Sequence, residues 1–144
     1  MGIFTQNNLP SQEESLKLIE ETLLSMDVSS FTKEYSGDDI ESLYFVITDK
    51  IDLSIRLPLC IEVIEKSLLI DYREIKRKDK LDIREKAERI ALAELARYVE
   101  TVSVMVKLGQ TTLKESFLAF SYDHKHGKTI YQMIEEKGMK FLEE

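Results

Sequence analysis

The longest helical pattern in the sequence runs from Asp82 to Gly109, where apolar residues recur at steps of three and four and fall along one stripe of a helix. Asp82 followed by Glu85 is typical of a capping box, and Gly109 can end the helix in the left-handed conformation. The first half carries mixed charges on its outer face, whereas residues 101–106 are almost entirely apolar. We therefore expect a long central helix whose second half is enclosed on more than one side, by other elements or by a second copy of the chain.

Before this helix, the spacing of hydrophobic positions changes from that of a helix to that of strands. Residues 1–10 show no period and predict a loose lead-in, after which Ser11 and Glu14 cap a first helix that runs to about Met26. Three runs rich in β-branched and aromatic residues follow, at 28–36, 40–48 and 51–57. Apolar and polar residues alternate strictly in the third run, as in a strand with one buried face. Short turn sequences separate the runs, so we predict a three-stranded antiparallel meander.

Helical spacing returns on both sides of the central helix. Pro58 ends the third strand and can occupy the first turn of the helix that follows it. After Gly109, Thr112 and Thr129 are predicted to cap two shorter helices, and the second of these places Tyr131 toward the core. The predicted fold class is therefore α+β in a single domain, 1–144, with an N-terminal helix, a three-stranded antiparallel meander, a long central helix and two shorter C-terminal helices.

Composition adds bounds to this picture. A chain of 144 residues with 43% hydrophobic residues can bury one core without cross-links. The single cysteine, Cys60, lies between two apolar residues, which favours a buried thiol and excludes an intrachain disulfide. Neither a secretory signal nor an apolar run of about 20 residues is present, so we expect a cytoplasmic protein without membrane association. Residues 1–65 carry a net charge of −9 within a total of −7, which argues against general coating of nucleic acid.

Ligand-type residues crowd together in one predicted loop. Asp123, His124 and His126 lie within four residues of one another, and a loop can direct all three at one metal ion. Lys125 and Lys128 would oppose a cation, so a hydrated turn is the alternative. We expect no bound metal and no other cofactor, with these three residues as the candidates if a metal binds.

Lys128 and Thr129 follow Gly127 just before a predicted helix, where free backbone amides can hold an anion. A phosphate-binding loop of the common nucleotide-hydrolysing type requires a second glycine five residues before Gly127, and that position is Tyr122. Nucleotide hydrolysis is therefore not expected. Binding of a small anionic ligand at Lys128 and Thr129 remains a third functional hypothesis.

One cluster of basic residues lies between two predicted helices. They lie within 73–80 and comprise Arg73, Lys76, Arg77, Lys78 and Lys80. One interpretation is a short patch that contacts the phosphates of nucleic acid. The favoured interpretation is a solvated connector, because acidic residues within the segment offset part of its charge.

No recognisable motif places a base beside a serine or cysteine, so the sequence favours a binding protein over an enzyme. The apolar second half of the central helix offers the candidate surface for a partner, at Val102, Met105 and Val106. This partner is either an unidentified protein or a second copy of the chain, which would give a homodimer.

The order of several short segments gives a resemblance over roughly residues 28–140. These segments are 55–58 (IRLP), 84–89 (REKAER), Gly109, 112–115 (TLKE), 117–118 (FL), Asp123 and 127–131 (GKTIY). In this order the chain resembles small, functionally uncharacterised proteins encoded by bacteriophages and prophages. The resemblance implies a viral or mobile-element origin and a bacterial host, and it assigns no reaction. We therefore hypothesise a non-enzymatic accessory protein that binds a host or phage protein. The alternative is a protein of phage DNA metabolism that binds nucleic acid through the basic residues at 73–80.

Overall fold

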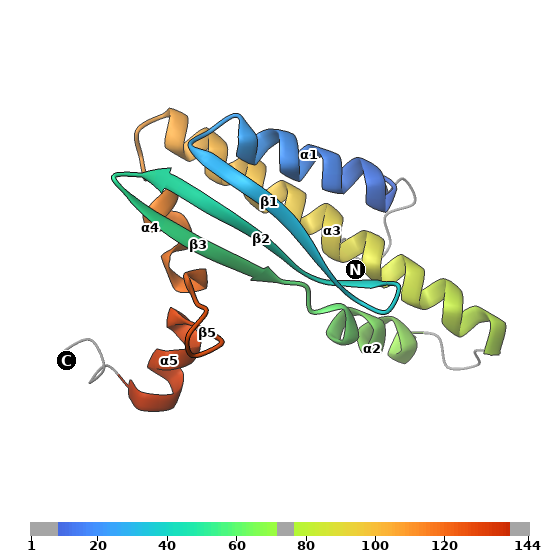
Figure 1. The fold of residues 1–144 in the computed structure, drawn as a ribbon. Coiled ribbons are helices and arrows are strands. Elements are labelled where there is room, and N and C mark those ends of the chain that lie inside the picture. Colours follow the sequence, from blue (N-terminus) through green and yellow to red (C-terminus); the bar gives the residue numbers. More distant parts are fainter. Residues whose placement is uncertain (1–8, 72–76, 139–144) are drawn as a thin grey trace.

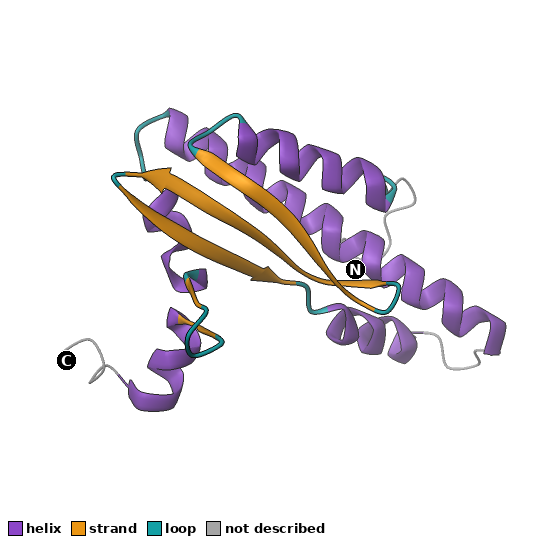
Figure 2. Cartoon of the chain, in the orientation of Figure 1, coloured by secondary structure: helices purple, strands orange, loops and turns teal. Residues whose placement is uncertain are grey.

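The computed structural model describes residues 9–71 and 77–138, apart from the side chains of residues 70–82. Its fold is the predicted α+β class, with helices and strands as drawn in Figures 1 and 2. The helices are α1 (Gln12–Leu24), α2 (Ile61–Asp71), α3 (Arg77–Lys107), α4 (Leu113–Phe117), a 3-10 turn η1 (Leu118–Phe120) and α5 (Ile130–Lys137). The predicted N-terminal helix, long central helix and shorter C-terminal helices are thus confirmed.

Three consecutive strands form the main sheet. They are β1 (Val28–Ser36), β2 (Asp39–Asp49) and β3 (Ile51–Pro58), antiparallel in the order β1-β2-β3. The predicted meander is therefore confirmed. Side chains alternate between its two faces, and one face buries Leu43, Phe45 and Ile47 of β2. Helices α1 and α3 cover this face, and the other face is turned toward the viewer in Figure 1.

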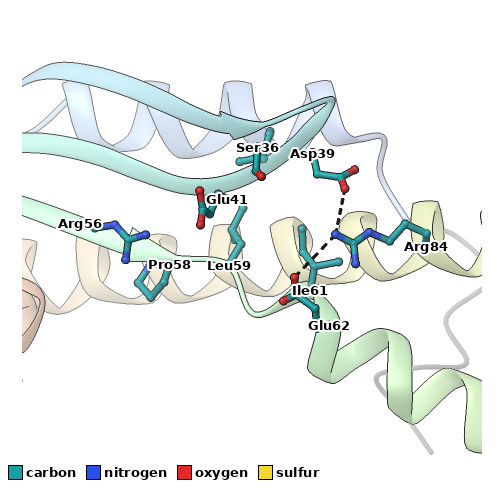
Figure 3. A pocket seen from close by; sticks show the side chains of 10 residues that line it. Ser36, Asp39, Glu41, Arg56, Pro58, Leu59, Ile61, Glu62 and Arg84 are labelled. Carbon is teal, nitrogen blue, oxygen red and sulfur yellow. Dashed lines mark hydrogen bonds and ion pairs between the residues drawn. The ribbon is translucent and has the colours of Figure 1, made fainter. Parts of the chain in front are cut away.

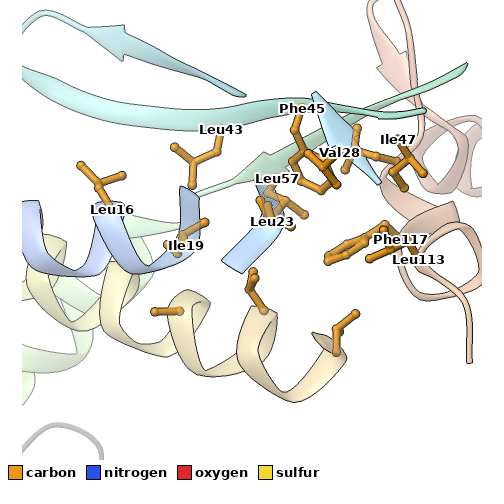
Figure 4. Close-up of a cluster of buried hydrophobic side chains, with 14 of the residues drawn as sticks. Leu16, Ile19, Leu23, Val28, Leu43, Phe45, Ile47, Leu57, Leu113 and Phe117 are labelled. Carbon is orange, nitrogen blue, oxygen red and sulfur yellow. The ribbon is translucent and has the colours of Figure 1, made fainter. Parts of the chain in front are cut away.

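The core lies between this sheet face and the helices (Figure 4). Ile19 and Leu23 of α1 are fully buried there, because the apolar stripe of the helix faces the strands. Phe117 of α4 closes one end, with its ring edge-on to Phe45 at a centroid distance of 5.3 Å. Burial of each such side chain contributes about 1.5–3 kcal/mol, so this cluster supplies much of the driving force for folding. A second cluster, built on Leu68, Ala87 and Ile90, joins α2 to the first half of α3.

The predicted helix ends are borne out by specific hydrogen bonds. The Ser11 Oγ accepts from the backbone N–H of Glu14 at 3.1 Å, and the Thr112 Oγ1 accepts from that of Glu115 at 3.1 Å. Thr129 and Gln132 form a complete capping box at the start of α5. Gly109 adopts a φ of +77° after the last turn of α3, which only glycine occupies without strain.

Two predicted boundaries are wrong. The central helix begins at Arg77 and not at Asp82, because the charged residues that precede Asp82 are good helix formers and extend it by more than a turn. Residues 121–128, predicted as a loop, contain a short hairpin of β4 (Tyr122–Asp123) and β5 (Lys128–Thr129). The hairpin adjoins the edge of β3 through a bridge between Ile55 and Ser121.

Three expectations about burial and position are also wrong. Pro58 ends β3 as predicted, but it does not lie in the first turn of the next helix, because α2 begins only at Ile61. Cys60 is exposed, because Leu59 packs against the core and Ile61 is buried, which turns the residue between them outward. Tyr131 is 57% exposed, since α5 buries none of its residues completely.

Candidate functional site

A cluster of carboxylates surrounds Arg84 in the first half of α3, and Figure 3 shows its contacts with Asp39 and Glu62. The guanidinium nitrogens lie 3.0 Å from Asp39, 3.1 Å from Glu65, 3.7 Å from Glu88 and 4.0 Å from Glu62. These partners come from the first residue of β2, from α2 and from α3 itself. Arg84 therefore ties three elements together, and its planar guanidinium donates to two of them at once, from Nη1 to Glu65 and from Nη2 to Asp39.

A cavity of about 240 Å³ opens beside this cluster. Asp39, Glu41 and Glu62 contribute carboxylates to its lining, and Arg56 contributes a second guanidinium (Figure 3). Because Arg84 is already engaged by four carboxylates, it is poorly suited to capturing an anion. The cluster therefore holds β2, α2 and α3 together, and one of its carboxyl groups can keep a proton.

Glu88 is the acid in this cluster that can hold that proton. Its side chain is only 10% exposed, and burial raises the pKa of Glu88 to about 7, with a further contribution from its hydrogen bond to Asp39. That same hydrogen bond is the main cause that lowers the pKa of Asp39. The Gln12 amide donates to the Glu88 carboxylate at 2.8 Å and partly opposes the rise. The pair thus shares one proton near neutral pH, with Glu88 as its holder.

A long groove runs between α1 and α3 on the side away from the sheet. It consists of two adjoining hollows of about 490 and 350 Å³, which share Leu18, Glu21 and Glu100. We call it the outer groove. Leu18 and Val104 present exposed apolar surface along it, and acidic and basic side chains alternate on its rims. Such a shape fits an amphipathic helix, whose apolar side chains can enter the groove while its polar ones meet the rims.

Small side chains form the floor of the outer groove. Ser15, Ala93, Ala96 and Ser103 are all buried there, which lets the two helices approach closely. Ser15 is 2% exposed, and its hydroxyl is the one buried side-chain polar atom without a hydrogen-bond partner in the described residues. An unpaired buried hydroxyl costs about 1–3 kcal/mol, so the close approach of α1 and α3 carries this cost.

The three predicted partner residues separate in the structure. Val102 is buried and belongs to the core cluster, so it is not accessible to a partner of the folded chain. Val106 is partly buried against the same core, and Met105 is 39% exposed. The apolar surface at this end of α3 is formed instead by Val104, Met105 and Leu108. Helical spacing predicts a partner surface at Val102, Met105 and Val106 and misses Val104, because the sequence does not show which side of α3 is covered by α1.

The three candidate metal ligands do not converge. The His126 Nδ1 lies 2.5 Å from the Asp123 carboxylate, whereas the His124 ring packs edge-on against Tyr122 at 4.9 Å. The hydrogen bond with His126 lowers the pKa of Asp123. Among the side chains that the structure describes, within 9–69 and 83–138, no group of three His, Cys, Asp or Glu residues is arranged to hold a metal ion.

The groups of the predicted anion site are bonded within the chain. Lys128 Nζ lies 2.5 Å from the Glu136 carboxylate, and the Thr129 hydroxyl accepts from the Gln132 amide. The backbone N–H of Thr129 donates in turn to the Gln132 side chain at 2.8 Å. An anion would have to displace these contacts.

The structure does not describe the side chains of the five residues predicted to contact nucleic acid. Arg73 and Lys76 fall within 72–76, and Arg77, Lys78 and Lys80 belong to the first turns of α3. Their role stays a prediction.

Comparisons with other proteins add no relative. No protein-family model, no curated protein and no solved structure matches this chain. Of the helices that the structure describes, none is both long enough and apolar enough to cross a membrane.

Proposed function

We propose that this protein acts by binding another protein and not by catalysing a reaction, as an accessory protein of a bacteriophage or prophage. The observation that carries the proposal is the outer groove, along which Leu18 and Val104 are exposed between charged rims. An amphipathic helix of the partner occupies the groove. Its apolar side chains cover Leu18 and Val104, and its polar side chains meet the rims.

Charge supports a protein partner in the outer groove. Glu14, Glu21 and Glu100 line it together with Lys17 and Arg97, so both signs lie along the same rims. A helix with mixed charges can complement such rims, whereas the continuous phosphate charge of nucleic acid would meet repulsion from the three glutamates.

A pull-down with matched variants tests the proposal. The tagged protein is expressed in infected or lysogenic bacterial cells, and partners are identified by mass spectrometry with and without nuclease treatment. We expect a specific protein to be retained by the wild type and by Val63→Glu, which alters an exposed residue of α2, and to be lost with Leu18→Glu/Val104→Glu. Circular dichroism of each variant verifies that it is folded.

Other outcomes reassign the function. Recovery that disappears with nuclease would assign the protein to nucleic acid through the basic residues at 73–80. A partner that binds Leu18→Glu/Val104→Glu as well as the wild type would contradict the outer groove as the site. Light scattering at high micromolar concentration distinguishes the occupant, since a dimer that the double variant abolishes would make it a second copy of the chain.

A further inference from the structure

The face of the sheet turned away from α1 and α3 carries a separate hollow of about 500 Å³. Strands β1, β2 and β3 form its floor, and the β4–β5 hairpin adds Tyr122 and His124 at its edge. The volume lies within the range of about 300–1,000 Å³ that is usual for small-molecule sites. The sheet separates this hollow from the outer groove, so the two surfaces are independent.

Aromatic rings form the walls of this hollow. The Tyr122 ring stands edge-on to Tyr44 at 5.6 Å and an interplanar angle of 82°, and edge-on to His124 at 4.9 Å and 83°. Successive rings therefore meet at right angles and make a corner. Two of them come from the C-terminal hairpin and one from the middle of the sheet, so the corner exists only in the folded chain.

Hydroxyl groups surround the floor. Val46 supplies an apolar patch, and Ser30, Thr32 and Ser54 place hydroxyls around it. Ser30 has a φ of +58° at an irregularity in the pairing of β1 with β2, a conformation that non-glycine residues rarely adopt. Such local strain is common beside binding sites, where a bulge redirects a side chain.

The charges next to the hollow are already satisfied by one another. The Arg56 guanidinium lies 3.8 Å from Glu34, and its Nε donates to the Tyr44 hydroxyl at 3.0 Å. Ser42 donates to the same Glu34 carboxylate at 3.1 Å. A charged ligand would have to compete with this arrangement, whereas an uncharged one leaves it intact.

We propose that this hollow binds the uncharged, hydroxyl-bearing ring of a saccharide. The ring's polarised C–H groups pack against Tyr122, because the Arg56 guanidinium already lies over the Tyr44 ring at 5.9 Å. The ring's hydroxyls pair with Ser30 and Ser54, which can both donate and accept, and with Thr32, which donates to the Ser30 carbonyl at 3.5 Å and can still accept. The ligand's source is either a free sugar or the sugar of a nucleoside, which offer the same ring.

An NMR titration of the full chain, labelled with ¹⁵N, tests this proposal. The probes are glucose, N-acetylglucosamine, maltose, adenosine and glucose 6-phosphate at millimolar concentration. We expect at least one uncharged saccharide to shift amides of the hollow, and glucose 6-phosphate to bind more weakly than glucose. Stronger shifts with adenosine than with any saccharide would identify a nucleoside as the source of the ring.

Variants locate the site. Tyr122→Ala removes a wall, Ser54→Leu fills the floor without touching the core, and Tyr131→Ala alters an exposed tyrosine on α5 as a control. We expect affinity to fall at least tenfold in the first two and to stay unchanged in the third. Tyr122→Ala can unfold β4, whereas Ser54→Leu leaves the hairpin intact. The affinity of Ser54→Leu therefore tests the site even if Tyr122→Ala does not fold. The proposal is overturned if no uncharged probe shifts these amides, if glucose 6-phosphate binds best, or if Ser54→Leu binds like the wild type.

Discussion

In α3, the half with more charged residues is the more enclosed one, although composition suggests the opposite. The first half is rich in charged residues, yet it packs against α2, and both Ile90 and Glu88 are buried. The second half is nearly all apolar between residues 101 and 106, yet Val104 is 55% exposed and Leu108, just after the helix, is 67% exposed. Other elements of the chain therefore leave its outer side open, and enclosure there by a second copy of the chain stays a prediction.

This contrast shows that burial depends on which elements cover a helix and not on its composition alone. Glu88 is buried because Arg84, Gln12 and Asp39 supply partners for its carboxylate. Val104 stays exposed because α2 extends only along the first half of α3. Exposed apolar surface of this kind is typical of binding sites.

The largest expected difference between the two halves is in the cost of removing apolar side chains. Ile90→Ala should lower the free energy of unfolding by about 2–5 kcal/mol, because it leaves a cavity between α2 and α3. Val104→Ala should change it by less than about 0.5 kcal/mol, since its side chain is half in solvent. Urea denaturation measures both values, and equal effects would contradict the contrast.

Removal of the cation in the first half should have the next largest effect. Arg84→Met leaves four carboxylates without their counter-charge and should cost about 1–3 kcal/mol at pH 8. The cost should shrink at pH 5, where Glu88 is protonated. Lys17→Met, which removes an exposed ion pair with Glu21, is the matched control and should have almost no effect. A loss that does not depend on pH would argue against the carboxylate cluster as its cause.

The raised pKa of Glu88 predicts a pH dependence of its own. The folded protein keeps this proton up to about pH 7 while the unfolded chain loses it near 4.5, so the folded form binds more protons between these values. The free energy of unfolding should therefore fall as pH rises through this window. The lowered pKa of Asp39 acts only below about pH 4.

Glu88→Gln keeps the shape of the side chain and removes its titration. It should flatten the pH profile and raise stability by about 1 kcal/mol above pH 7. Glu85→Gln alters an exposed neighbour and should leave the profile unchanged. Thermal denaturation at pH 5, 6, 7 and 8 makes the comparison, and a wild-type profile that rises with pH in this range would disprove the assignment.

The smallest effect is expected where the second half ends. Gly109→Ala places a side chain at a φ of +77° and should cost about 1 kcal/mol, because L residues are strained there. Gly109→Asn should cost less, since asparagine tolerates this conformation. The order of the two midpoints in urea tests the explanation.

Most of the fold could be predicted because its determinants are local. The strand at 51–57 and the caps at Ser11, Thr112 and Thr129 each depend on a few neighbouring residues, and all are found in the structure. The alternation of burial in this strand holds at Ile55 and Leu57 but not at Ile51, which is 75% exposed. The errors arose where distant segments decide the outcome. Cys60 is exposed because its two neighbours fill the core positions, a choice that the sequence does not display.

The sites were harder to predict than the fold for the same reason. Arg84 and Glu88 are four residues apart and could have been paired by helical spacing, but Asp39 joins them from 45 residues before Arg84. Ser15, Ala93 and Ala96 resemble ordinary helix residues, and only the packing of α1 on α3 turns them into the floor of a groove.

The connectivity of the sheet has a consequence for the order of folding. Strands β1, β2 and β3 pair with their sequence neighbours through short turns, whereas α1 meets α3 across a separation of 76 residues between Gln12 and Glu88. Closing a short loop costs less entropy than closing a long one, so the meander should form before α1 docks. In pulsed hydrogen exchange during refolding, amides of β2 should gain protection ahead of those of α1. Docking of α1 then builds the outer groove, which makes partner binding a property of the completed fold alone.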